Sequence, residues 1–175
     1  MNYAKITYMD TANGIGLRTT LFVSGCRHHC KECFNQETWD FQYGKPFTDI
    51  EKRDILTSLE NPHVKGITFL GGEPLEPENQ PVIRELIETI VHDYPDKDIW
   101  LYTGCTFEEL AYDTCPYRTE HTDYILSHTD ILVDGPFIQN EIDLIGTPFR
   151  GSRNQRLIRC KDCYQTGQLL LLDIN

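Results

Sequence analysis

The chain has 175 residues, with 27 acidic and 16 basic side chains, a net charge of −11 and a pI near 4.9. This length suits one domain with a real core, and this charge argues against binding nucleic acid or anionic membranes. No apolar run approaches the ~20 residues of a membrane span, and residues 1–7 have no apolar signal core, so we expect a cytoplasmic protein. In a reducing compartment the seven cysteines favour metal or redox chemistry over disulfides.

The first part of the chain predicts two strands and a helix. Residues 3–9 alternate between apolar and polar and predict an edge strand, and residues 19–24 predict a second strand that ends at Gly25. Residues 48–51 have the form of a capping box, which predicts a helix ending near residue 61.

Predicted strands and helices continue to alternate up to residue 133, and the pattern is weaker after that. Short apolar runs predict strands, and apolar residues three or four positions apart predict helices. The expected strands are 66–70, 98–103 and 131–133. The expected helices are 82–91, one opened by a capping box of Thr106 and Glu109, and 123–127. We expect loops over residues 112–122 and 139–156.

Strands that alternate with helices predict a parallel α/β sheet with right-handed crossovers. Unusual residues follow these strands directly, at 26–33, 71–73, 103–104 and 134–135. In an α/β barrel the ends of the strands share one face, where active sites form. A full barrel takes ~250 residues, so we expect an incomplete, laterally open (β/α) barrel.

The stretch beginning at Cys26 reads Cys-Arg-His-His-Cys-Lys-Glu-Cys. Cys26, Cys30 and Cys33 could hold three corners of a 4Fe–4S cluster and leave the fourth iron open to activate a small molecule. Two alternatives stand beside this one. The thiols could belong to a zinc site completed by His28, His29 or a distant cysteine, or they could be ordinary buried thiols.

The Cys-x3-Cys-x2-Cys pattern, together with Gly-Gly-Glu-Pro after another strand, resembles the radical S-adenosylmethionine superfamily. More narrowly, residues 1–156 are similar to the activating enzymes of anaerobic ribonucleoside-triphosphate reductase. Ile15, where the family usually has Pro, and Cys105, where it often has an aromatic residue, depart from its pattern. The closer resemblance rests on Asn13-Gly14-x-Gly16-x-Arg18, residues 21–26, Asn35 with Thr38-Trp39, residues 97–100 and 133–135, and residues 150–152 with Asn154-Gln155.

The resemblance implies a barrel of the radical S-adenosylmethionine type over residues 1–156, with residues 157–175 as a tail and no separate domain. It implies that Cys26, Cys30 and Cys33 bind the cluster, and that the open iron binds S-adenosylmethionine. Reductive cleavage then gives a 5′-deoxyadenosyl radical, which generates a glycyl radical on the partner reductase. The electron donor is expected to be a low-potential protein such as flavodoxin or ferredoxin.

The expected contacts to S-adenosylmethionine are Glu32, Cys33, Phe34, Gly71, Gly72 and Glu73. The two glycines would let the backbone approach the ligand where a Cβ would collide, and Glu73 would assist at the methionine amine. Residues 32–34 would lie against the adenosyl group. Beyond the cluster and the cofactor we expect no catalytic residue, and His28 and His29 are expected to be simple loop residues.

Several roles stay open. Thr103 and Asp134 could bind ribose hydroxyls or the methionine carboxylate, or serve as turn and cap residues. Cys160 and Cys163 form a second Cys-x2-Cys pair. This pair could be half of a zinc site with Cys105 and Cys115, a redox pair, ligands of a second cluster, or unligated thiols in a mobile tail.

The alternative functions are an activase of another glycyl-radical enzyme (pyruvate formate-lyase type), a small-molecule radical enzyme, and, in another class, a zinc-binding interaction module.

Overall fold

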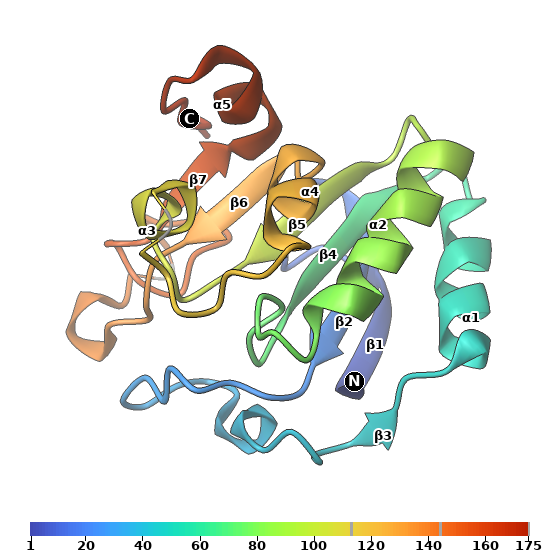
Figure 1. The fold of residues 1–175 in the computed structure, drawn as a ribbon, viewed down its shortest axis with the longest axis horizontal. Coiled ribbons are helices and arrows are strands. Elements are labelled where there is room, and N and C mark those ends of the chain that lie inside the picture. The colour runs from blue at the N-terminus through green and yellow to red at the C-terminus, as the bar shows by residue number, and fades with distance from the viewer. Residues whose placement is uncertain (113, 144, 175) are drawn as a thin grey trace.

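A computed structural model describes residues 1–112, 114–143 and 145–174. Residues 113, 144 and 175, which fall in the two expected loops and the tail, lie outside the described residues. The centre of the fold is an open seven-stranded sheet in the order β3-β1-β2-β4-β5-β6-β7 (Figure 1). The strands are β1 (Asn2–Asp10), β2 (Leu17–Val23), β3 (Lys45–Pro46), β4 (Val64–Gly71), β5 (Asp98–Tyr102), β6 (Ile131–Asp134) and β7 (Arg156–Arg159).

The expected parallel arrangement holds in the middle of the sheet and is wrong at its edges. Strands β2, β4, β5 and β6 are parallel neighbours, whereas β1, β3 and β7 pair antiparallel. The link between β1 and β2 is too short for a parallel crossover, which needs a dozen or more residues. The sheet does not close on itself, and its description as a partial barrel of the radical S-adenosylmethionine type stays a prediction.

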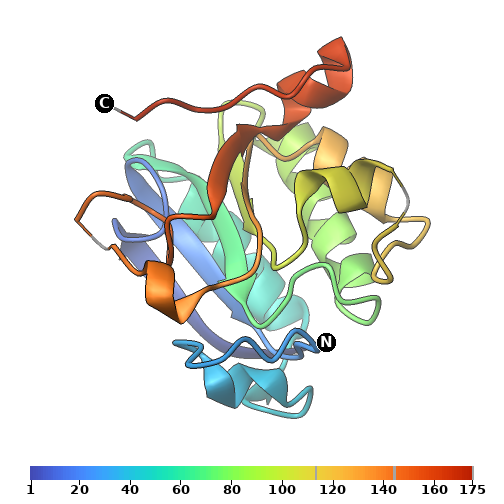
Figure 2. The ribbon, with the colours of Figure 1, turned by 90° about the vertical axis from the view of Figure 1, so that its left-hand side faces the viewer.

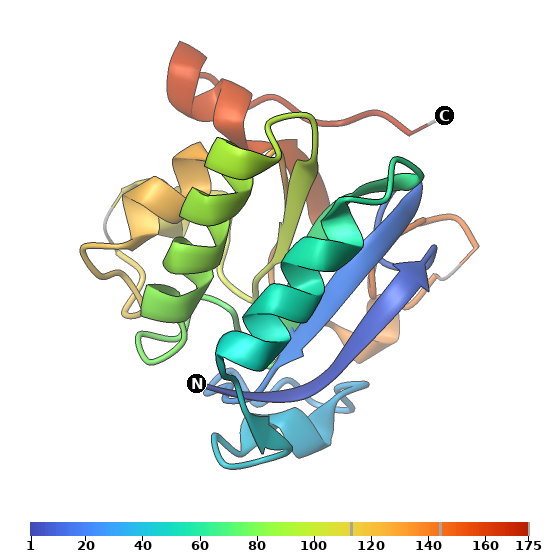
Figure 3. The ribbon, with the colours of Figure 1, turned by 90° about the vertical axis from the view of Figure 1, so that its right-hand side faces the viewer.

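The helices lie mainly on one side of the sheet. They are α1 (Asp49–Leu59), α2 (Gln80–Asp93), α3 (Phe107–Ala111), α4 (Thr122–Ser127) and α5 (Cys160–Thr166), with 3₁₀ turns η1 (Gln36–Trp39) and η2 (Gln139–Glu141). Figure 3 shows α1 and α2 over one face, and in Figure 2 the segment between β6 and β7 runs on the other side. None of the helices in the described ranges combines the length and the apolar character that crossing a membrane requires.

Both expected capping boxes are confirmed. The hydroxyls of Thr48 and Thr106 accept hydrogen bonds from backbone N–H groups of the first turns of α1 and α3. Glu51 and Glu109 in turn accept from the backbone of these threonines. Each box satisfies donors that a helix start would otherwise leave unpaired.

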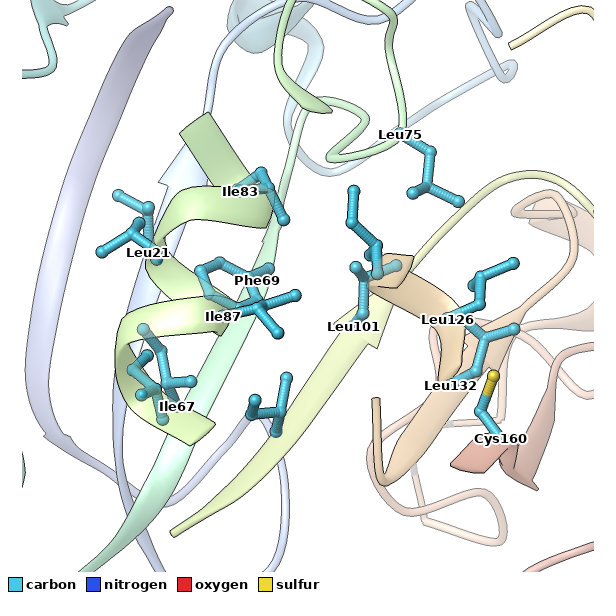
Figure 4. Packing of buried hydrophobic residues seen from close by; sticks show 14 of the residues in the cluster. Leu21, Ile67, Phe69, Leu75, Ile83, Ile87, Leu101, Leu126, Leu132 and Cys160 are labelled. Atoms are coloured by element: carbon cyan, nitrogen blue, oxygen red, sulfur yellow. The ribbon is translucent and has the colours of Figure 1, made fainter. Parts of the chain in front are cut away.

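The apolar face predicted for α2 forms the centre of the core. Its fully buried residues pack against the inner sides of β2, β4 and β5 (Figure 4), and they include Ile83, Leu86, Ile87 and Ile90.

The C-terminal segment packs against the sheet, so the alternative of a mobile tail is wrong. Strand β7 pairs with β6 along its length, and Ile158 forms a further bridge with Leu171. Cys160 and Cys163 are 0% and 3% exposed and belong to the main hydrophobic core. Strand β7 also crosses the boundary proposed at residue 156, and this division of the chain stays a prediction.

Candidate functional site

A cleft of about 460 Å³ lies where the parallel strands end. Loops that follow β2, β4, β5 and β6 all contribute to its walls. These four strands are adjacent and parallel, so their carboxyl ends meet at one edge of the sheet. The lining residues that the sequence singled out include Cys26, Cys30, Cys33, Phe34, Gly71, Gly72, Glu73, Thr103, Gly104 and Gly135.

The three thiols of the loop after β2 line this cleft together. Cys26 is buried, and Cys30 and Cys33 are partly exposed. Burial, with a smaller contribution from the charge of Glu73, raises the pKa of Cys26 to about 12, and burial also raises the pKa of Cys30. The Cys26 and Cys30 thiols therefore stay protonated unless metal ions displace the protons, as coordinating metals do.

The cysteine loop is anchored at both ends by backbone hydrogen bonds. The Gly25 N–H donates to the Thr38 carbonyl at 2.8 Å, and the Cys26 N–H donates to the Trp39 carbonyl at 3.2 Å. His29 stacks on Trp39 with ring centroids 4.6 Å apart. The loop therefore leaves the sheet at the end of β2, and its far end, η1, lies against its beginning.

Arg27, which sequence reasoning passed over, ties the loop to the turn after β4. Its backbone N–H donates to Glu76 Oε1 at 2.7 Å, and its guanidinium binds the other oxygen of Glu76. The same guanidinium donates to Glu78 Oε1 at 2.5 Å. Glu76 is fully buried, and this burial raises its pKa although Arg27 favours the charged form.

His28 is not a simple loop residue, and that expectation is wrong. Its Nε2 lies 2.9 Å from Glu73 Oε2. The same oxygen accepts from the Gly104 N–H at 2.8 Å and from the Thr103 hydroxyl at 3.1 Å, while Oε1 accepts from the Leu75 N–H at 2.9 Å. Burial opposes protonation of His28, but the contact with Glu73 outweighs it and raises the pKa.

The Glu73 carboxylate thus joins the ends of three neighbouring strands. It accepts a hydrogen bond from the chain after β4, two from the chain after β5, and one from the cysteine loop after β2 if His28 Nε2 carries a proton. Its expected contact with the methionine amine stays a prediction. In the structure the Glu73 carboxylate holds together the chain segments that follow β2, β4 and β5.

The two glycines at the end of β4 are required by the packing of the protein backbone itself. A Cβ on Gly72 would lie 2.5 Å from the Gly25 carbonyl oxygen, so it would collide with the start of the cysteine loop. The expected close approach of these glycines to the ligand stays a prediction. Gly71 has a φ of +113°, in the region that favours glycine, and its Cβ would lie 2.7 Å from the Val23 carbonyl oxygen. The glycines allow two strand ends to lie in close backbone contact.

Residues 32–34 divide between the cleft and the solvent. Phe34 lines the cleft, is 59% exposed and lies 4.9 Å from the ring of Phe137, centroid to centroid. Glu32 is exposed, has a φ of +56° and does not line the cleft. Phe34 therefore lines the cleft and Glu32 does not, and the expected cofactor contact of each stays a prediction.

Thr103 and Asp134, whose roles the sequence left open, lie in different surroundings. Thr103 lines the cleft. Asp134 is buried, and its carboxylate accepts from the Phe107 N–H at 2.7 Å, at the first residue of α3, and from Arg156 Nε at 3.0 Å. Asp134 thus caps α3 and pairs with Arg156, away from the cleft lining.

The comparisons with known proteins fit this geometry. A family model described as "4Fe-4S single cluster domain" matches residues 12–158. The anaerobic ribonucleoside-triphosphate reductase-activating protein of Pasteurella multocida is 40% identical over 161 residues, which is 91% of this chain and 98% of that protein. The chain belongs to this family of activating proteins. Its 4Fe–4S cluster domain and the resemblance noted in the sequence are thereby confirmed.

Other members of the family show similar coverage. The activating protein of Escherichia coli K12 is 41% identical over 159 residues, covering 89% of this chain and 96% of that protein. The activating protein of Enterobacteria phage T4 is 36% identical over 159 residues, covering 90% of this chain and 93% of that protein.

One wall of the cleft also lies within the residues that the family model matches. It comes from the segment between β6 and β7, where sequence reasoning expected only a loop. Among the described residues that line the cleft, Arg150 is the only Arg or Lys. Its Nη1 donates to the Gln155 carbonyl at 3.3 Å, while its buried Nε has no hydrogen-bond partner. Its place in an Arg-Gly-Ser motif was the available signal.

The remaining cysteines are not gathered into a metal site. Within the described ranges, no three His, Cys, Asp or Glu side chains are arranged to hold a single metal ion. Cys105 and Cys115 are neighbours with sulfurs 2.8 Å apart, whereas Cys160 and Cys163 lie on α5, beyond the residues that the family model matches. The zinc site that was one of the alternatives for these four residues gains no support from the described part of the chain.

Proposed function

We propose that this chain is an activating enzyme that generates a glycyl radical on an anaerobic ribonucleoside-triphosphate reductase. A 4Fe–4S cluster held by Cys26, Cys30 and Cys33, with S-adenosylmethionine beside it, would provide the radical chemistry. The observation that carries the proposal is the joint lining of one cleft by these thiols and the Gly-Gly-Glu turn, in a chain about 40% identical to named activating proteins.

The donor set fits a cluster. Thiolate sulfur is a soft ligand that suits iron–sulfur clusters, and the loop presents three such donors to one cleft. Neither histidine of the loop is needed as a ligand, since His28 binds Glu73 and His29 stacks on Trp39. When bound, the cluster supplies one electron that cleaves S-adenosylmethionine into methionine and a 5′-deoxyadenosyl radical.

The cleft also suits S-adenosylmethionine. Its volume of about 460 Å³ lies within the ~300–1,000 Å³ of small-molecule sites. Arg150, which lines the cleft, would bind the methionine carboxylate, because charge-assisted pairs with carboxylates are strong. Phe34 and Phe137 would provide an aromatic wall for the adenine. Glu73 and His28 would hold the ends of the strands in place.

The open sheet suits a macromolecular substrate. A reactive radical must be shielded from water and stray hydrogen donors, and this sheet does not close around the cleft by itself. A docked partner would complete the wall and present a glycine, whose lack of a side chain permits close approach. The electron would come from a low-potential donor such as flavodoxin or ferredoxin.

The test is anaerobic reconstitution of the chain followed by mixing with the reductase, S-adenosylmethionine and a low-potential reductant. We expect a doublet in electron paramagnetic resonance on the reductase, lost when its target glycine is changed to Ala. A parallel reaction with a pyruvate formate-lyase separates this substrate from the other glycyl-radical enzymes. Efficient turnover of a free small molecule without any partner would contradict the proposal, and a colourless zinc protein would contradict its cluster.

A further inference from the structure

A pair of thiols outside the cysteine loop lies behind the wall of the cleft. Cys105 directly follows Thr103 and Gly104, the residues that hold Glu73, and Cys115 is ten positions farther along the chain. Their Sγ atoms are 2.8 Å apart, and the residues are 3% and 6% exposed. Neither residue lines the cleft or takes part in the proposed activation.

The separation of the sulfurs is short for two atoms that are not bonded. Even carbon atoms, which are smaller, reach their best non-bonded contact at ~3.5–4.0 Å, whereas a disulfide bond is ~2.05 Å long. A movement of under about 1 Å would therefore bring Cys105 and Cys115 to bonding distance. The pair is much closer to a disulfide than to two independent core residues.

We propose that Cys105 and Cys115 form a reversible disulfide when the protein meets a low-molecular-weight disulfide. Cys115, as its thiolate, attacks the small disulfide, forms a mixed disulfide and releases one small thiol. Cys105 then attacks the Cys115 sulfur and releases the second small thiol. The two protein thiols are oxidised, the small disulfide is reduced to two thiols, and these carry away the two protons.

The surroundings of the pair determine which thiol reacts first. Burial, with contributions from Glu73 and the neighbouring thiol, raises the pKa of Cys105, so this residue is a poor first nucleophile. Cys115 lies between Thr114 and Pro116, which are both exposed. A local opening of this segment exposes Cys115 without disturbing the strand end that holds Cys105.

The bond would strengthen the support behind the cysteine loop. Cys105 Sγ lies 3.9 Å from His28 Nε2, and the ring of Tyr117, two residues after Cys115, lies 4.8 Å from the His28 ring. The Tyr117 carbonyl also accepts from the Gln80 side chain at 2.6 Å. A disulfide would fix the segment after α3 to the end of β5, on both sides of His28.

The experiment treats the anaerobically reconstituted chain with oxidised glutathione, alkylates the remaining thiols and maps the peptides. Cleavage after Lys and Arg releases residues 98–118 as one peptide that contains both cysteines. We expect this peptide to become two hydrogens lighter and unalkylated, and a second cleavage after Glu108 or Glu109 to leave two linked fragments. Dithiothreitol should restore both alkylated cysteines, while Cys160 and Cys163 remain alkylated throughout.

Two further arms decide the outcome. Denatured chain under the same oxidant establishes that the reagent is effective, and Cys115→Ser should abolish the linkage and leave Cys105 alkylated. Full alkylation of Cys105 and Cys115 in the folded wild-type chain, or linkage of either residue mainly to another cysteine, would overturn the proposal. The wild-type map is decisive even if the variant fails to fold.

Discussion

Two Cys-x2-Cys pairs of identical spacing occur in this chain, and the fold gives them opposite surroundings. Cys30 and Cys33 lie in a loop beyond the end of a parallel strand and line the cleft. Cys160 and Cys163 lie on α5 within the core, and Figure 4 shows Cys160 close to Leu126 and Leu132. The spacing identifies thiols that can act together, and only their position relative to the strand ends separates cluster ligands from core residues.

The polar neighbours of the two pairs differ in the same way. The cysteine loop is held by charged contacts of Arg27 and His28 to the turn after β4. In the tail, Cys163 Sγ accepts a hydrogen bond from the Leu170 N–H at 3.2 Å, and Cys160 is enclosed in the core. Free buried cysteines of the second kind behave as small apolar residues.

The largest expected effect comes from removing a thiol of the loop pair. Cys30→Ala leaves two thiolates in the loop, too few for a cluster with one open iron, so iron should fall from about four per chain to near background. Iron content and visible absorbance after anaerobic reconstitution measure this loss. Cys163→Ala is the matched control and should keep its iron. Iron near the wild-type level in Cys30→Ala would refute the assignment of the ligands.

The next effect concerns the close contact between the two strand ends. Gly72→Val places a branched side chain against the Gly25 carbonyl, which a Cβ would already approach to 2.5 Å. We expect unfolding to become easier by about 1–3 kcal/mol, as for other overpacked sites, and iron retention to fall with it. Denaturant unfolding and iron analysis give both values. A full cluster combined with loss of S-adenosylmethionine cleavage would instead indicate direct contact with the ligand.

A smaller effect is expected from the anchor of the cysteine loop. Glu76→Ala leaves the Arg27 backbone N–H without its acceptor, a loss that typically costs about 1–3 kcal/mol. Iron should also dissociate faster during exposure to a chelator, because the loop is less well held. Glu78→Ala is the matched control and should change little, because exposed ion pairs contribute weakly.

The variant Glu76→Gln separates charge from shape at the same position. The raised pKa of Glu76 means that burial penalises its charged form, so a neutral amide that retains an acceptor should behave more like the wild type than Ala does. Equal losses in Glu76→Gln and Glu76→Ala would show that the ion pair with Arg27, rather than the acceptor, holds the loop.

The sequence predicted the parts of this site that depend on local patterns. Strand ends, capping boxes and the apolar face of α2 are encoded in neighbouring residues, so the four adjacent strands and the loops after them could be anticipated. The contacts Arg27–Glu76 and His28–Glu73 join residues 49 and 45 positions apart. Such pairs depend on how two loops meet, which no local pattern describes.

The strand directions at the edges of the sheet and the packing of the tail were harder to predict from the sequence, for another physical reason. An antiparallel edge strand and a parallel inner strand can have similar residue patterns, and the connection from β6 to β7, residues 135–155, is long enough for either direction. The apolar residues of the tail stand mainly in two short separate groups, 157–158 and 169–172, so its packing became evident only through pairing of β7 and the bridge from Ile158 to Leu171.

The smallest expected effect completes the comparison between the two thiol pairs. Cys160→Ala removes one sulfur from a fully buried side chain, and a deletion of this size should lower the free energy of unfolding by about 1 kcal/mol. Cys160→Ser should cost more, because a hydroxyl group in an apolar core needs a hydrogen-bond partner. Both variants should bind as much iron as the wild type. Loss of iron in Cys160→Ala, with little change in stability, would mean that the tail pair also holds metal.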